Sequence, residues 1–368
     1  MTYLGIDLHS NQFTCCFLEE GEKTVTKVFT LETASLHEFY KLLNKNTYIM
    51  VEASTNTFKF VELIEHKVKQ VFIANTFKLK LISMVKKKTD KVDAEKLAIF
   101  LKMQITSNEE LIKPVYKPDE KTQVLRALFT SYKLIRKQIV STKNRIHALL
   151  KQNLMPFTKT YIFGKAGRET IKSLTMSESL KFQLYTFFEL LESNEAYCQK
   201  IKDRILLEGA CYKREIELLT SMKGLSVFTG IALMADISTI SRFKNSKHFA
   251  SYLRSAPGVD SSNERTRNLA TNKCGRRLSI ILISQALNHF RDNNPKINSW
   301  YNKVIEYKPK GKARMAICRR VFTEIFQMLK KGEYHYFRDE ENHRMKYKKY
   351  QAFLEKNGFF EEKVSKVA

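Results

Sequence analysis

Glycine and proline are scarce in this chain for its length. Its 368 residues include 12 Gly and 6 Pro. These are the two residue types that most often interrupt helices, so regular helix is expected to dominate. Hydrophobic residues still make up 43% of the chain, which supports packed cores and excludes wholesale disorder. A chain of this length has room for two or three domains.

Paired cysteines and long apolar runs are also missing. The six Cys residues form no Cys-x-x-Cys pair, so the sequence offers no zinc site of the usual spacing. We expect these cysteines to be reduced thiols in a cytoplasm. No long apolar run or secretory signal is present, so a membrane protein is not expected.

Acidic residues are in deficit. The chain has 38 Asp and Glu against 64 Lys and Arg, which gives a formal net charge of +26 and a pI near 9.7. A chain with this balance is expected to bind an acidic partner. Nucleic acid is favoured over an anionic membrane, because the sequence has no apolar segment to enter a bilayer.

Short strand-like and helix-like segments alternate near the beginning of the chain. The predicted strands are 2–8, 12–19, 24–31, 47–52 and 69–73, and the predicted helices are 34–44 and 57–67. Three strands followed by helix, strand, helix and strand indicate a mixed sheet with helices on its faces. In such sheets, ligands gather at the carboxyl ends of the strands.

Four acidic residues stand out against this pattern. Asp7 and Glu52 each lie near the end of a buried strand, and Asp90 and Asp93 are three residues apart at a predicted helix start, where they share one face. Carboxylates gathered at one edge of a sheet repel each other unless a divalent cation lies between them. The pattern therefore predicts a Mg²⁺ site for phosphodiester chemistry. The alternative is four ordinary surface acids, with Thr89-Asp90 serving only to cap a helix.

Two heptad seams follow a linker that Pro114 and Pro118 mark. The first contains Leu125, Leu128, Tyr132, Ile135, Ile139, Thr142, Ile146 and Leu149, and the second contains Leu180, Leu184, Phe187, Leu191, Asn194, Cys198, Ile201 and Ile205. Spacings of three and four residues predict long helices that pair along these seams. The two helices could form a hairpin within one chain or pair with another subunit.

The C-terminal half is expected to be helical. Residues 213–236 indicate two helices joined at a tight Gly224 turn, and further helices are predicted at 276–291, 296–307 and 312–331. The helix-turn-helix could contact phosphates through backbone N–H groups, or it could be an ordinary helical turn. Between these helices, residues 254–275 are expected to form a polar loop.

Ser261 and Ser262 lie in this polar stretch among basic residues. A serine that attacks a phosphodiester needs nearby cations or metals to activate its hydroxyl and hold the phosphate. Serines are also common in polar loops that have no such role. The basic residues that we expect to contact nucleic acid are Lys86, Lys87, Lys88, Arg136, Lys137, Arg145, Arg265, Arg267, Lys273 and Arg276.

Several stretches together resemble a family of bacterial insertion-sequence transposases, the IS110 family. GIDLH near the beginning, VEAS in the middle strand and KTDKVDAEKLA are similar to the family's DEDD motif. LLTSMKGLSVFTGIALMADI, RFKNSKHFASYLRSAPGVDSS, NKCGRRLSIILISQA and ARMAICRRVFTEIFQMLKKGEYH are similar to its second conserved domain. The resemblance covers about residues 1–335 in the family's order.

This resemblance implies a fold of three parts and a tail. Residues 1–110 would be an RNase H-like domain of the Holliday-junction-resolvase type, an α/β fold in which Asp7, Glu52, Asp90 and Asp93 bind Mg²⁺. Residues 111–212 would be a linker and coiled-coil helices. Residues 213–335 would be an all-α transposase domain that carries the serine loop, and 336–368 a basic tail.

The resemblance also implies an activity and partners. The protein would cut and exchange DNA strands through a phosphoserine-linked intermediate, acting on donor and target DNA that a structured non-coding bridge RNA selects. It would assemble as homodimers that pair into a tetramer, in a bacterial cytoplasm and on the nucleoid when acting. Ser262 fits the family's nucleophile best and Ser261 is the close competitor, because Ser262-Asn263 stands where many members have Ser-Gly.

Two other functions fit parts of the sequence. A metal-dependent endonuclease or Holliday-junction resolvase would use the same four acids with water as the nucleophile, and it would not need Ser261 or Ser262. A non-enzymatic nucleic-acid-binding protein would need only the basic surfaces. Covalent attachment of the protein to DNA separates the first alternative from a serine recombinase.

Overall fold

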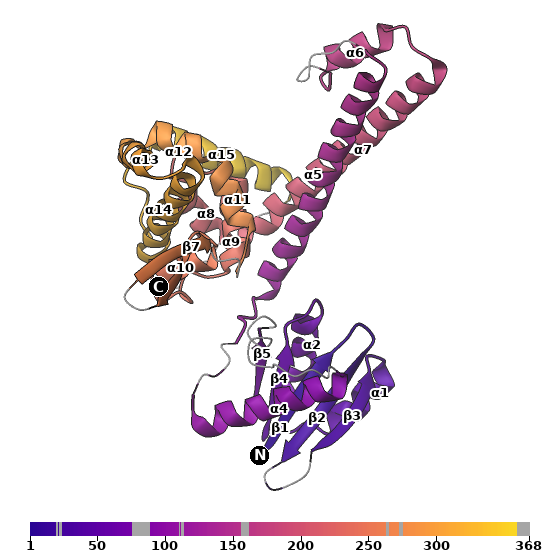
Figure 1. The fold of residues 1–368 in the computed structure, drawn as a ribbon, viewed down its shortest axis with the longest axis vertical. Helices are drawn as coiled ribbons and strands as arrows, with labels where there is room; N and C mark the ends of the chain where they lie inside the picture. Colours follow the sequence, from indigo (N-terminus) through magenta and orange to yellow (C-terminus); the bar gives the residue numbers. More distant parts are fainter. Residues whose placement is uncertain are drawn as a thin grey trace. The chain divides into compact units, whose positions relative to one another are not determined.

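The computed structural model describes residues 1–19, 21, 24–75, 89–109, 111, 114–155, 162–262, 265–271 and 275–358. For residues 259–262 and 265–270 it describes the backbone alone. Contacts divide the chain into two compact units, Met1–Pro118 and Asp119–Ala368, and each is described by itself (Figure 1).

The first unit is built on one mixed five-stranded sheet with the order β3-β2-β1-β4-β5. Its strands are β1 (Thr2–Leu8), β2 (Gln12–Glu19), β3 (Val25–Thr30), β4 (Thr47–Glu52) and β5 (Gln70–Ala74). Strand β1 pairs antiparallel with β2 and parallel with β4, which in turn is parallel to β5. The strands agree with the sequence prediction to within one residue at each end, and the mixed sheet is confirmed.

Helices cover both faces of this sheet. They are α1 (Thr33–Lys41), α2 (Thr57–Ile64) with the 3₁₀ turn η1 (Glu65–Lys67), and α4 (Asp90–Ser107). Phe39 of α1 and Phe60 of α2 pack in one core with Leu4 and Ile6. Tyr3, one position along β1, packs with residues of α4. This is the alternation expected of a strand buried on both faces.

Gly5 allows α4 to lie directly on β1. A Cβ atom at Gly5 would come within 2.0 Å of the Ala94 carbonyl oxygen and 2.4 Å of the Ala98 amide nitrogen. No side chain fits between the strand and the helix at this point. Ala94 and Ala98, both fully buried, bring the helix backbone close from the other side. This close approach brings the first turn of α4 to the edge of the sheet at which β1 ends.

The second unit begins with a helical hairpin of α5 (Glu120–Gln152) and α7 (Glu178–Glu208). The short helix α6 (Lys165–Ser173) lies in the connection that joins them at the end of the hairpin (Figure 1). Leu149 and Leu180 share one core, and Leu125 and Ile205 share another. The end of each helix therefore lies beside the start of the other, and the two run antiparallel. The predicted seams face each other within one chain, and Asn194 is buried among them.

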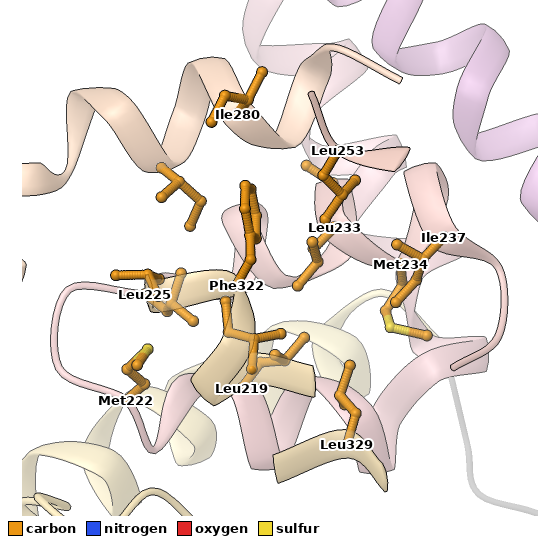
Figure 2. Close-up of a cluster of buried hydrophobic side chains, with 14 of the residues drawn as sticks. Leu219, Met222, Leu225, Leu233, Met234, Ile237, Leu253, Ile280, Phe322 and Leu329 are labelled. Atoms are coloured by element: carbon orange, nitrogen blue, oxygen red, sulfur yellow. The ribbon is translucent and has the colours of Figure 1, made fainter. Parts of the chain in front are cut away.

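The remaining helices of the second unit pack around one large core. They are η2 (Gly209–Tyr212), α8 (Lys213–Thr220), α9 (Val227–Ile237), α10 (Ser246–Tyr252), α11 (Leu278–Gln285), α12 (Leu287–Asn293), α13 (Pro295–Tyr307), α14 (Lys310–Lys331) and α15 (Glu340–Lys356). Figure 2 shows Phe322 of α14 among Leu225, Leu233 and Ile280. Across the described residues of both units, no helix combines the length and the apolar content that a membrane crossing requires.

Two features of this unit match or extend the sequence analysis. Gly224 has a φ of +97° in the turn between α8 and α9, so the tight turn predicted at this glycine is confirmed. The segment expected to be a basic tail contains α15, which is packed into the unit. Tyr350 and Leu354 of α15 are buried in the large core, and the Tyr350 hydroxyl donates a 2.8 Å hydrogen bond to the Leu206 carbonyl oxygen.

Two secondary-structure predictions are wrong. Residues 254–275 do not form a polar loop throughout, because β6 (Pro257–Ser262) and β7 (Arg265–Thr271) pair as an antiparallel hairpin. Apolar residues are few in both strands and do not alternate with polar ones, which is the pattern by which strands are recognised. The helix predicted at 276–291 is two helices, α11 and α12, which meet at Ala286.

Candidate active site

Asp7 and Glu52 lie at the carboxyl ends of the two central parallel strands. Ile6 of β1 pairs with Val51 of β4, so Asp7 and Glu52 are the next residues along two neighbouring strands. The chain after β4 is held in place because the Thr57 hydroxyl donates to the Glu52 carbonyl oxygen over 2.8 Å. The side chain of Asp7 is 14% exposed. The sheet therefore presents one largely buried and one half-buried carboxylate at the same edge.

The first turn of α4 adds two more carboxylates. Asp90 is the first residue of the helix and Asp93 lies one turn later, in contact with Lys96 at 3.2 Å. Thr89 is the N-cap, and its hydroxyl accepts a hydrogen bond from the Val92 amide. Acidic residues in a first turn are stabilised by the helix dipole. Thr89 therefore caps α4, as the alternative interpretation of Thr89-Asp90 predicted. The same helix also places its acids near the edge of the sheet.

His9 connects the strand acids to the helix acids, and the sequence analysis missed it. Its Nε2 atom lies 3.3 Å from the Asp7 carboxylate and 3.2 Å from the Asp90 carboxylate. One ligand atom from each of these three residues lies within 4.8 Å of the other two, a grouping that could hold a metal ion. The Asn56 side chain donates to the His9 carbonyl oxygen over 2.8 Å. The one feature of the sequence that could have indicated His9 is its position two residues after Asp7.

Burial and neighbouring charges both shift the pKa of the Asp7 carboxyl. Burial raises the pKa of the Asp7 carboxyl above its usual value, and the negative charges of Asp90, Asp93 and Glu52 raise it further, while His9 opposes them. Each of these three acids is therefore close enough to act on Asp7. The four sequence-predicted acids lie near one edge of the sheet, and two of them, Asp7 and Asp90, join His9 in the grouping whose ligand atoms lie within 4.8 Å of one another.

The raised pKa of Asp7 predicts how stability changes with pH when no metal is bound. The folded protein then holds a proton that the unfolded chain releases, so the free energy of unfolding falls as pH rises from about 4 through the folded-state pKa. Asp7→Asn removes this penalty. The variant should be more stable than the parent at pH 7 in a chelator, and the gap should close near pH 4. Urea unfolding at both pH values measures it; an equal gap at both would contradict the assignment.

The two candidate nucleophiles lie in the second unit, on the β6–β7 hairpin. Ser262 pairs with Arg265 and Ser261 with Thr266, so both serines are at the end of β6 that adjoins the hairpin tip. Arg267 pairs with Asp260, further from the tip. The backbone thus places two of the predicted basic residues on the strand directly opposite the serines.

The other predicted nucleic-acid contacts are distributed over both units. Arg136, Lys137 and Arg145 are exposed on α5, and the Arg145 guanidinium lies over the Phe187 ring at 5.9 Å. Arg276 is 38% exposed and donates to the buried Asp236 carboxylate over 3.0 Å. The predicted contacts Lys86, Lys87, Lys88 and Lys273 lie outside the described residues.

Comparison with protein families identifies the chain. One family model, described as a transposase with the DEDD signature of IS110, matches residues 4–155. A second, described as the transposase IS116/IS110/IS902 family, matches residues 216–302. No curated protein matches the chain. The two matches cover the acidic site in one unit and the serine hairpin in the other.

The protein is therefore a DNA transposase, an enzyme that cleaves and recombines DNA. It belongs to the IS110 family of insertion-sequence transposases. The family resemblance predicted from the sequence is confirmed. DNA is the partner that this class of enzyme requires, in agreement with the net charge of +26.

Proposed function

We propose that this transposase moves its insertion sequence by serine-linked strand exchange under the guidance of a structured RNA. One observation supports the proposal above the others. The four acids and the serine hairpin occur in different units of one transposase chain, and each is matched by a different family model. An enzyme that used water alone would need only the acids.

The first unit has the features of an RNase H-like nuclease domain. The strand order 3-2-1-4-5, with β2 antiparallel to β1, supports this interpretation. So does the placement of acids at the ends of β1 and β4 and on a helix packed across both strands. Such a domain holds a DNA strand by its scissile phosphate over the carboxylates.

Mg²⁺ fits the donor set at this edge. Asp7, Glu52, Asp90 and Asp93 offer carboxylate oxygens, which are the ligands that Mg²⁺ prefers. Burial and then the neighbouring negative charges raise the pKa of Asp7, and a divalent cation would relieve the repulsion among these carboxylates. Bound Mg²⁺ would supply positive charge against the phosphodiester oxygens. His9 is a nitrogen donor beside this set, and we propose that it orients Asp7 and Asp90.

The proposed chemistry is a transesterification at phosphorus. The Ser262 hydroxyl oxygen forms a bond to the scissile phosphorus, and the bond from phosphorus to one deoxyribose oxygen breaks. The serine proton is lost and the departing sugar oxygen gains one. One phosphodiester replaces another, so the energy of the broken bond is kept in the phosphoserine link. A hydroxyl of a second strand can then reverse the step and complete the exchange.

This scheme requires an active site that is assembled from two units. Asp7 belongs to the first compact unit and Ser262 to the second. We propose that DNA, guide RNA and paired subunits bring the two halves together, and that the protein assembles as homodimers pairing into a tetramer. Cleavage would then occur only within the complete complex, which protects the cell from unprogrammed cutting.

Guide RNA binding has its own expected result. The protein should co-purify from its natural host with one predominant RNA, encoded next to its own gene. Base pairing would carry the target specificity, so the basic surfaces need only grip the phosphate backbone. Sequencing of the RNA extracted from the purified protein tests this. A population of unrelated RNAs, with recombination unaffected by ribonuclease, would refute the guided scheme and leave the transposase assignment intact.

A further inference from the structure

Asp236 is a completely buried carboxylate near the end of α9. Its side chain is 0% exposed, in a helix whose other residues near this point are apolar. A buried carboxylate without partners would cost several kcal/mol. Asp236 has three partners. One carboxylate oxygen accepts from Arg276 Nε at 3.0 Å, and the other accepts from the Ser279 amide and hydroxyl, both at 2.8 Å.

One side of the Asp236 carboxylate caps a neighbouring helix. Ser279 is in the first turn of α11, whose N-cap residue, Arg277, makes no side-chain capping bond. Asp236 therefore satisfies a free amide group at the start of α11 in place of the usual cap, and its charge suits the helix dipole. This fixes the position of α11 relative to α9.

The opposite side of the carboxylate holds Arg276, which follows the serine hairpin in the chain. Arg276 follows β7, and its backbone amide donates to the Tyr252 carbonyl oxygen over 3.1 Å. Gly275 has a φ of +104°, and a Cβ atom there would lie 2.1 Å from the Tyr252 carbonyl oxygen. Arg254, just before β6, donates from Nε to the Gly275 carbonyl oxygen over 2.7 Å. Arg254, just before β6, and Gly275 are thus held against each other beside Tyr252.

The backbone around Asp236 is anchored as firmly as its side chain. Arg126 of α5 donates to the Ala235 and Asp236 carbonyl oxygens over 2.8 and 2.9 Å. Burial lowers the pKa of the Arg126 guanidinium, and the Tyr252 and Asp236 groups act against this. The Tyr252 hydroxyl adds a 3.2 Å bond to the Asp236 carbonyl oxygen. Asp236 is therefore held by α5, α10 and α11 together.

We propose that Asp236 is a positioning residue that aims Arg276 at the DNA backbone. The inference rests on the proposed function. Arg276 binds Asp236 through Nε, while 38% of its side chain remains exposed beside the hairpin. A guanidinium that is fixed at one nitrogen loses less entropy on binding a phosphate than a free one does. Arg276 then grips one phosphate while the serine of β6 attacks another.

Salt dependence of DNA binding tests the proposal without requiring any chemistry. The full-length protein is bound to a duplex of mixed sequence in a chelator, and log K is measured against log salt concentration. Arg276→Ala should reduce the slope by about one phosphate contact. Asp236→Asn keeps Arg276 but removes the carboxylate charge that holds it in place. The slope of this variant should fall by the same amount as that of Arg276→Ala. Ser279→Ala removes a bond to the same carboxylate without touching Arg276, and it should keep the parental slope.

Each result decides the matter. A reduced slope for Arg276→Ala with a parental slope for Asp236→Asn would overturn the positioning role of Asp236. Parental slopes for both variants would show that Arg276 does not contact a phosphate and would overturn the whole proposal. If Asp236→Asn does not fold, Arg276→Lys replaces it. Lysine keeps the charge but cannot donate from the position of Nε, so a reduced slope supports positioning and a parental slope refutes it. If the parent protein fails to recombine DNA while the slopes behave as expected, the proposed function is refuted, and the positioning of Arg276 by Asp236 is still supported.

Discussion

Ser262→Ala should abolish recombination between a donor and a target plasmid, with a loss of at least about a thousand-fold. The alanine variant keeps the acids and the basic surfaces but has no oxygen to form the covalent link to phosphorus. Loss of an attacking serine is among the largest effects known for a single substitution in an enzyme. Ser262 is at the end of a paired strand, and alanine removes only one hydroxyl oxygen there, so the variant is expected to fold normally.

Ser261→Ala is the matched control for this experiment. It removes an identical hydroxyl from the adjacent position of the same strand, and recombination should stay within a few-fold of the parent. The reverse result, with Ser261 essential and Ser262 dispensable, would move the nucleophile by one residue. Normal recombination by both single variants would remove the serine link from the account.

Asp7→Ala should reduce DNA cleavage at least about a hundred-fold. The side chain of Asp7 is less exposed than that of Asp90 or Asp93. Its burial raises its pKa, and the charges of the other three acids raise it further. Removing it takes away an oxygen ligand of the proposed Mg²⁺ site and the charge that favours a divalent cation there. Single-turnover cleavage of a labelled DNA, measured over a range of Mg²⁺ concentrations, gives both the rate and the metal requirement.

Glu65→Ala is a suitable control for the loss of an acid in the same unit. Glu65 pairs with Lys117 at 2.7 Å on the surface, and its side chain is 46% exposed. Such a pair contributes little to stability, so cleavage by this variant should match the parent. Equal cleavage by the parent and Asp7→Ala at every Mg²⁺ concentration would contradict the metal site.

The acidic site could be predicted from the sequence because its geometry follows from simple rules. Parallel strands end at the same edge of a sheet, which brings Asp7 beside Glu52. Asp90 and Asp93 share a face because three residues make nearly one helical turn. The close contact of α4 with β1 at Gly5 could not be predicted in this way, because a glycine within a strand can equally mark a bulge or a tight bend.

Other parts of the site depend on contacts that leave little trace in the sequence. His9 has no second histidine at a metal-binding spacing, and only the fold brings it to Asp90. The sequence of the serine hairpin shows no regular alternation of apolar residues, so hydrophobic periodicity could not reveal it. Asp236 did carry a signal. A single acid within the apolar run LMADI must either be paired or disrupt the helix, and its partners Arg276 and Ser279 follow some forty residues later.

The central claim is that the carboxylates of one unit serve a serine nucleophile of the other. Its most direct test is to incubate the protein and its RNA with donor and target DNA and Mg²⁺, denature the mixture, and map any peptide that remains linked to DNA. We predict a phosphoserine link at Ser262 that Asp7→Ala does not form. Cut DNA with no attached peptide, or an undiminished link in Asp7→Ala, would contradict the account.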